Sequence, residues 1–235
     1  ADCICVQEVK AQAPDVIGRF DELAGSKGYF HFAEKKGYSG VGVYSRHEPS
    51  DVIAGFGSPE FDAEGRYLEL RFDTPTRALS IISVYFPSGS SGPERQEAKY
   101  RFLDLFRPHL DALHPRREFV LCGDVNISHQ QIDLKNWRSN QKNSGFLPQE
   151  RQWVTQLLQE GNLVDVYRRL EPTATDAAYT WWSNRGQAYV KNVGWRLDYH
   201  LASPSIASKA LRAAIYKDEK FSDHAPLTIE YDLVL

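Results

Sequence analysis

Hydrophobic and polar residues along this chain follow two different periods, one typical of strands and one typical of helices. Short apolar runs with strand-like composition recur throughout, and we expect the first of them to be buried on both faces. These runs are CICVQE (3–8), GVGVYS (40–45), RYLELRF (66–72), LSIISVYF (79–86), EFVLCGD (118–124), RLDYHLAS (196–203) and PLTIEYDL (226–233).

Apolar residues at spacings of three and four predict two longer helices between these strands. The first runs from Pro93 to Leu110, with Pro108 expected to mark its end, and the second from Pro148 to Glu160, with Gly161 as its stop. Long polar stretches at 88–93, 128–145 and 173–193 predict functional loops. We therefore expect one α/β domain over residues 1–235, with two facing sheets and helices outside them.

Charge and cysteine content narrow the possible settings of the protein. The formal net charge of −3 argues against a uniformly basic coat for nucleic acid, although a local basic groove remains compatible with it. The three cysteines show no disulfide spacing, which favours a reducing, cytosolic setting. No apolar run is long enough to cross a membrane.

Polar side chains stand at the ends of several predicted strands, where catalytic residues often lie because a rigid strand meets a loop there. Crowded carboxylates repel one another, and a divalent cation relieves that repulsion. An oxygen-rich set without a cysteine or histidine cluster favours Mg²⁺ or Mn²⁺ over Zn²⁺. Taken singly, each of these residues is better explained as a strand-end cap or a surface group. Together, and with a histidine adjacent, they predict a hard-cation site formed by Glu8, Asp124, Asn126 and Asp223.

The stretch CGDVNIS suggests how such a site would act. Asp124 is placed to orient or deprotonate a water, and Asn126 to donate a hydrogen bond to an oxygen that gains charge. Gly123 is expected to let the backbone turn so that both side chains face one cleft. From the dipeptide DH alone, a structural surface histidine is the favoured interpretation of His224; the alternative is a contact with a phosphate oxygen, with Asp198 holding the tautomer of the ring. No G-x-S-x-G is present, so a serine nucleophile is not implied.

Aromatic and amide side chains in the polar loops suggest contacts with a larger substrate. Trp181 and Trp195 suit the walls of a pocket for a flat or extrahelical group, whereas Trp182 is expected in the core. The loop DLKNWRSNQKNSG interleaves amides with cations, a mixture that suits phosphate and sugar contacts along a duplex as well as a solvated loop.

These residues resemble those of the exonuclease III class of apurinic/apyrimidinic (AP) endonucleases, within the DNase I-like phosphoesterase superfamily. The most specific stretches, NSGFLPQER and KNVGWRLDY, favour DNA-repair members over phosphoinositide phosphatases and sphingomyelinases. The other matching stretches lie in family order along nearly the whole chain: CVQEVK, KKGYSGVGVYSR, EGRYLELRFD, VYFPSG, LCGDVNISHQQIDLKN and SDHAPLTI.

The resemblance implies a four-layered α/β sandwich, two facing mixed sheets flanked by helices. It implies Mg²⁺-dependent hydrolysis of the DNA backbone 5′ to abasic sites, with Mn²⁺ as an alternative ion. Related 3′-phosphodiesterase, 3′-phosphatase or 3′→5′ exonuclease activity in base excision repair is common in the family. The implied partner is double-stranded DNA with abasic sites or blocked 3′ ends. The implied protein is a monomer that acts in the cytoplasm, at the bacterial nucleoid, or in a nucleus.

The resemblance also assigns roles to single residues. Glu8 corresponds to the principal metal ligand, and Asp124, Asn126, Asp223 and His224 belong to the same metal region. The catalytic positions are Tyr85 near the scissile phosphate, Asp124 and Asn126 at the water and the transition state, and His224 with Asp198 behind it. The DNA-contacting positions are Lys10, Tyr38, Asn140 and Asn143, with Trp181, Trp195 and Leu197 around the flipped sugar.

Two departures from the family pattern bear on these roles. The family carries an Asn-x-[Asn/Asp]-Gly motif on its first strand, and we expect that strand to precede Ala1. Ser88 stands where many members have Asn or Gln. Two alternatives stay open: a non-catalytic or impaired DNA-binding fragment, and a phosphoinositide or phospholipid phosphoesterase of the same superfamily.

Overall fold

The computed structural model describes all residues from Ala1 to Leu235, and they form two compact units. The first unit comprises Ala1–Phe86, Asp104–Asp124 and Val234–Leu235, and the second comprises Pro87–Leu103 and Val125–Leu233. Each unit combines strands with helices, as the two sequence periods predict. That residues 1–235 act as a single domain stays a prediction.

One sheet of the first unit is antiparallel, with strand order β1-β4-β3-β2. Its strands are β1 (Cys3–Gln7), β4 (Val41–Ser45), β3 (Ser26–His31) and β2 (Glu22–Leu23). The expectation that β1 is buried on both faces is wrong: its residues are mostly half-buried, and Ile4 is 38% exposed. The reason is its position at the edge of this sheet, where β4 is its only hydrogen-bonded neighbour.

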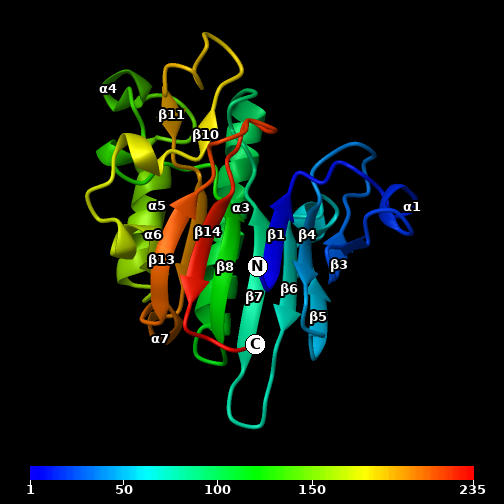
Figure 1. The fold of residues 1–235 in the computed structure, drawn as a ribbon. Coiled ribbons are helices and arrows are strands. Elements are labelled where there is room, and N and C mark those ends of the chain that lie inside the picture. Colours follow the sequence, from blue (N-terminus) through cyan, green and yellow to red (C-terminus); the bar gives the residue numbers. More distant parts are fainter. The chain divides into compact units, whose positions relative to one another are not determined.

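The other strands of the first unit lie side by side in the order β5, β6, β7, β8 (Figure 1). They are β5 (Asp51–Ala54), β6 (Tyr67–Arg71), β7 (Leu79–Tyr85) and β8 (Glu118–Asp124). β7 and β8 are parallel, and their register pairs Tyr85 with Asp124. This pairing brings two of the predicted site residues to the same end of adjacent strands. The unit also contains the short helices α1 (Ala13–Val16) and α2 (Pro59–Asp62).

Helix α3 (Pro93–Leu113) starts at the predicted proline but continues past Pro108, so the expected end is wrong. Residues up to Leu103 group with the second unit and residues from Asp104 with the first. A proline inside a helix removes one backbone hydrogen bond. Burial of Phe106, Leu110 and Leu113 on both sides of Pro108 offsets that loss.

The second unit is built from three antiparallel strand pairs. They are β9 (Val164–Asp165) with β12 (Asp198–Ala202), β10 (Trp181–Trp182) with β11 (Gly194–Trp195), and β13 (Ala210–Ile215) with β14 (Leu227–Tyr231). Its helices are α4 (Trp137–Asn140), α5 (Pro148–Gln159), α6 (Val166–Leu170), α7 (Pro204–Ala207) and the 3-10 turns η1 (Gln131–Asp133) and η2 (Asp176–Ala178).

Two sequence predictions are confirmed in this unit. α5 ends at Gln159, two residues before the predicted stop at Gly161. Trp182 is buried in a core cluster with Tyr179, Ala188 and Ala225.

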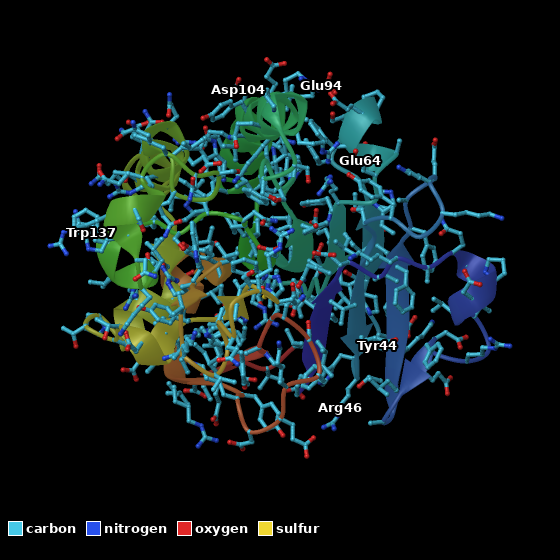
Figure 2. All side chains as sticks on the ribbon, turned by 90° about the horizontal axis from the view of Figure 1, so that it is seen from above. Tyr44, Arg46, Glu64, Glu94, Asp104 and Trp137 are labelled. Atoms are coloured by element: carbon cyan, nitrogen blue, oxygen red, sulfur yellow. The ribbon has the colours of Figure 1, made fainter.

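Trp137, labelled in Figure 2, begins α4 within the long polar loop, so that loop is partly helical. No helix combines the length and apolar character that a membrane crossing requires.

Candidate active site

Glu8 directly follows β1, and its backbone is in the left-handed region with φ of 52°. Lys10 has φ of 50°, and its ammonium group forms an ion pair with Glu8. The backbone N–H groups of Val9 and Lys10 donate to the carbonyls of Gly40 and Ser39, at 3.1 and 2.8 Å. Non-glycine residues rarely take this conformation, and such strain clusters at functional sites. The local backbone therefore marks Glu8 as a functional candidate.

Asp124 ends β8 and is only 3% exposed. Its carboxylate and that of Glu8 each offer an oxygen within 4.8 Å of the other. The adjoining Gly123 matters for a reason other than the predicted turn. A Cβ at that position would lie 1.9 Å from the carbonyl oxygen of Val84, so the close approach of β7 and β8 excludes any side chain. The glycine thereby sets the position of the Asp124 side chain.

Tyr85 faces this carboxylate pair from β7. Burial raises the pKa of its hydroxyl well above the usual value, and the nearby carboxylates of Glu8 and Asp124 raise it further. The guanidinium of Arg66, 4.8 Å from the ring centroid, lowers the pKa only in part. Tyr85 is therefore protonated at neutral pH and can act as a hydrogen-bond donor.

Arg66 is a residue of this site that the sequence analysis missed. Its buried guanidinium donates to the carbonyl of Tyr85 and to the hydroxyl of Tyr38, both at 3.0 Å. The Tyr38 hydroxyl donates in turn to Glu64 at 3.2 Å, and Glu64, which is labelled in Figure 2, pairs with Arg66. The predicted DNA contact Tyr38 is thus connected to Tyr85. The only sequence signal was the position of Arg66 inside the family stretch EGRYLELRFD.

In the second unit, the carboxylate of Asp198 accepts a hydrogen bond from Nδ1 of His224 at 2.8 Å. Asp198 begins β12, and its backbone N–H donates to the hydroxyl of Thr180 at 3.1 Å. This places the acid behind the histidine, as the resemblance implies. With Nδ1–H held by a carboxylate, Nε2 is the ring nitrogen suited to contact a substrate oxygen.

Trp181 and Trp195 face each other across the β10–β11 pair, with ring centroids 6.4 Å apart and planes at 85°. Trp181 also donates its indole N–H to the carboxylate of Asp223 at 3.1 Å. Leu197 follows two residues after Trp195 and is buried. The predicted pocket walls are therefore neighbours. The carboxylate of Asp223 thus accepts a hydrogen bond from the indole of Trp181. Its predicted role near a metal stays a prediction.

Asn126 has a left-handed backbone, with φ of 55°. Its carbonyl accepts a hydrogen bond from the ammonium of Lys99 at 2.8 Å, and Lys99 forms an ion pair with Glu150 at 2.6 Å. Both charged side chains are fully buried. Glu150 also accepts from the backbone N–H of Gly145 at 2.7 Å. This buried pair fixes the conformation of Asn126, and sequence reasoning missed it although Glu150 lies in the stretch NSGFLPQER.

Asn140 and Asn143, at and just after α4, are hydrogen-bonded to each other and not to the site residues described above. The Asn143 amide donates to the Asn140 side-chain oxygen at 2.7 Å, and the Asn140 amide donates to the carbonyl of Asn136 at 2.8 Å. Their predicted contacts with DNA stay a prediction.

A second buried charge network anchors the segment that carries Trp195 and Leu197. Arg196, between them, pairs with Asp133 at 2.8 Å and with Asp165 at 2.6 Å, and all three side chains are buried. Its backbone N–H also donates to the carbonyl of Asp133 at 2.7 Å. The quoted stretches IDLKN and GWRLDY contain this pair, yet a rule that places charges outside the core could not have identified it.

Comparison with known proteins agrees with this geometry. The chain matches the Endonuclease/Exonuclease/phosphatase family over residues 1–224. It is 38% identical to an exodeoxyribonuclease of Bacillus subtilis, over 97% of this chain and 87% of that protein. It is 37% identical to the DNA repair nuclease APEX1 of Danio rerio, over 97% of this chain and 72% of that protein. Its fold resembles that of an AP endonuclease from Archaeoglobus fulgidus, with a TM-score of 0.88 and 27% identity, covering 99% and 89% of the two chains.

The chain therefore belongs to the Endonuclease/Exonuclease/phosphatase family. The predicted resemblance to exonuclease III class enzymes, the α/β fold class and the assignment to a family of nucleases are confirmed. The roles of single residues stay predictions.

Proposed function

We propose that this protein is a DNA-repair phosphodiesterase that hydrolyses the DNA backbone 5′ to abasic sites and trims blocked 3′ ends. The observation that carries the proposal is the carboxylate pair of Glu8 and Asp124, faced by the protonated hydroxyl of Tyr85. The family match and the relatives named for exodeoxyribonuclease and AP endonuclease activity support it.

The chemistry of these donors fits a hard divalent cation. Two carboxylate oxygens within 4.8 Å of each other repel when both are ionised, and Asp124 is almost fully buried. Oxygen-only donors suit Mg²⁺, with Mn²⁺ as the next choice. Glu8 and Asp124 would hold the ion. When bound, the ion would neutralise charge on the phosphate and on the leaving 3′-oxygen.

The protein's own groups then have distinct tasks in an in-line displacement by water. Asp124 orients the water and accepts its proton, and the Asn126 side-chain amide donates to a phosphate oxygen as charge builds there. Tyr85, kept protonated by its surroundings, donates a hydrogen bond near the same phosphate. No side-chain nucleophile is required, so the reaction has no covalent intermediate.

His224 contributes through Nε2, which contacts a phosphate oxygen while Asp198 holds Nδ1. Trp181, Trp195 and Leu197 would wall the pocket for a sugar turned out of the duplex. Lys10, Tyr38, Asn140 and Asn143 would contact the DNA backbone and so position the duplex without reading its sequence.

The test uses three substrates side by side. They are a duplex with one tetrahydrofuran abasic analogue, a duplex with a recessed 3′-phosphate, and a soluble inositol phosphate, each with Mg²⁺ and with chelator. The proposal expects incision 5′ to the analogue and release of the 3′-phosphate, both abolished by the chelator. Turnover of inositol phosphate alone would favour the phosphoinositide alternative. DNA binding without any turnover would favour the non-catalytic alternative.

A further inference from the structure

The loop between β13 and β14 exposes two aromatic rings that pack against each other. Phe221 is 70% exposed and Tyr216 is 43% exposed, and their ring centroids are 6.4 Å apart at 35°. Single exposed apolar residues are ordinary, but two exposed rings that pack against each other at a tilt form a continuous aromatic surface, here called the platform. None of the roles assigned above uses this platform, so it calls for a separate explanation.

The platform rests on a well-anchored loop. The Tyr216 backbone N–H donates to the carbonyl of Pro226 at 3.0 Å and closes the base of the loop. The Tyr189 hydroxyl donates to the carbonyl of Lys217 at 2.8 Å, and the Trp182 N–H to the carbonyl of Asp223 at 3.0 Å. Figure 1 shows this loop beside β10, which carries Trp181 and Trp182.

The charges of the loop favour a flat, neutral group over a phosphate. Lys217 and Lys220 lie over the rings of Trp182 and Tyr189, at 5.1 and 5.3 Å from the centroids. Asp218 and Glu219 lie between them and Asp223 follows, so two lysines stand against three acids and the loop has no surplus of cations. Phosphate contacts require a surplus of cations, whereas base stacking requires an exposed π surface. The loop therefore supplies the exposed π surface that base stacking requires, and lacks the surplus of cations that phosphate contacts require.

The same loop ends in Ser222-Asp223-His224, which fixes how far the platform is from the proposed chemistry. Three residues of chain span at most about 10 Å, which matches the rise of about three base pairs along the axis of a DNA duplex. A nucleotide next to a phosphate held by His224 is thus within reach of Phe221. Away from a duplex terminus, an unpaired base is the flat group that presents its face at that distance, because interior paired bases are stacked on both sides.

We propose that Phe221, supported by Tyr216, stacks on an unpaired nucleobase near a 3′ end and so favours DNA with frayed or single-stranded 3′ termini. This inference rests on the proposed function, because it takes the DNA phosphate to lie at His224. It adds a specificity-determining residue outside the catalytic set.

The direct test measures stacking without catalysis. In chelator, the protein is titrated into two hairpin duplexes, one blunt and one with a three-nucleotide 3′ overhang that contains 2-aminopurine. Stacking on Phe221 quenches the 2-aminopurine and makes the overhang bind more tightly than the blunt end. Phe221→Ser should lose the quenching and weaken overhang binding about tenfold, within the range of one base–aromatic stack. Phe221→Trp should restore both.

Leu211→Ser is the matched control, because Leu211 is 60% exposed on β13 but lies outside the loop. It should behave as the unaltered protein. Equal affinity of the unaltered protein for both hairpins, or quenching that survives Phe221→Ser, would overturn the inference. Hydrolysis of the abasic duplex is scored separately. If it fails while the quenching is seen, the proposed function falls and the base-stacking platform stands.

Discussion

Asp198 and His224 lie 26 residues apart in the chain and form a hydrogen bond of 2.8 Å between Oδ2 and Nδ1. Asp198→Asn keeps the shape of the acid but can present an amide N–H to Nδ1, which favours the opposite tautomer of the ring. We expect the single-turnover rate on the abasic duplex to fall about 10²-fold, in the range of one acid–base contribution. Affinity for the duplex, measured by anisotropy in chelator, should stay within twofold.

The matched control for that change is Asp232→Asn, an exposed acid of the same unit. It removes one negative charge without touching His224 and should leave the rate unchanged. If Asp198→Asn and Asp232→Asn turn over alike, Asp198 is not a positioning residue for His224.

Glu8 and Asp124 yield a prediction about metal dependence. Glu8→Gln replaces one of two adjacent carboxylates with a neutral amide, which weakens the attraction for a divalent cation. The Mg²⁺ concentration that gives half-maximal activity should therefore rise at least tenfold, and direct Mg²⁺ binding by calorimetry should weaken in parallel. Glu34→Gln alters an exposed acid in the same unit and serves as the control. An Mg²⁺ titration that coincides with that of the unaltered protein would remove Glu8 from the metal site.

The sequence predicted which residues stand at strand ends because apolar runs and polar tips are local signals. It predicted Glu8, Tyr85 and Asp124 at such ends, and the structure places all three together in the first unit. It did not predict why Tyr85 meets Asp124, since the parallel pairing of β7 with β8 depends on contacts between distant segments. The same limit explains the error at β1, because edge position is a property of the sheet and not of the strand.

The buried charges were beyond pattern reasoning for a different reason. Hydrophobic periodicity assigns lysine, arginine and acids to the surface, yet Lys99, Glu150, Asp133 and Arg196 are fully buried. Each is stable there because a partner of opposite charge lies within hydrogen-bonding distance. The backbone conformation of Asn126 and the position of Trp195 depend on these buried ion pairs. The site residues were therefore predictable from the sequence, whereas the buried charges that hold them in place were not.

Lys99 provides a test of that dependence. Lys99→Met leaves the Glu150 carboxylate buried without its cation and removes the hydrogen bond to the Asn126 carbonyl. We expect the free energy of unfolding to fall by about 3–5 kcal/mol, the usual cost of breaking a buried pair on one side. Urea denaturation measures the loss, and Lys209→Met, at an exposed lysine of the same unit, should cost little.

The double variant Lys99→Met/Glu150→Gln separates the effect of the unpaired Glu150 carboxylate on stability from the effect of the lost Asn126 hydrogen bond on activity. It removes the uncompensated charge and should recover part of the stability, while the activity stays low because Asn126 still lacks its support. Full activity in a folded Lys99→Met protein would show that the carbonyl contact does not position Asn126.

The buried carboxyl of Asp133 predicts how the free energy of unfolding depends on pH. Burial alone would raise the pKa of this carboxyl, but Arg196 and Arg168 outweigh it and hold the pKa at about 2. A carboxyl whose pKa is depressed in the folded state stabilises that state above its unfolded pKa, here about 4, and the contribution disappears as the pH falls toward 2. A shift of this size corresponds to about 2 kcal/mol.

Asp133→Asn should therefore lower the free energy of unfolding at neutral pH by at least about 2 kcal/mol, because both arginines lose their shared carboxylate. The deficit relative to the unaltered protein should hold constant down to about pH 4 and then shrink as the unaltered protein loses the same contribution. Urea denaturation at a series of pH values between neutral and about 3 measures the difference, with Asp232→Asn as the exposed control. A deficit that stays constant below pH 4 would mean that the ionised Asp133 carboxylate is not what holds Arg196, and with it the segment of Trp195 and Leu197, in place.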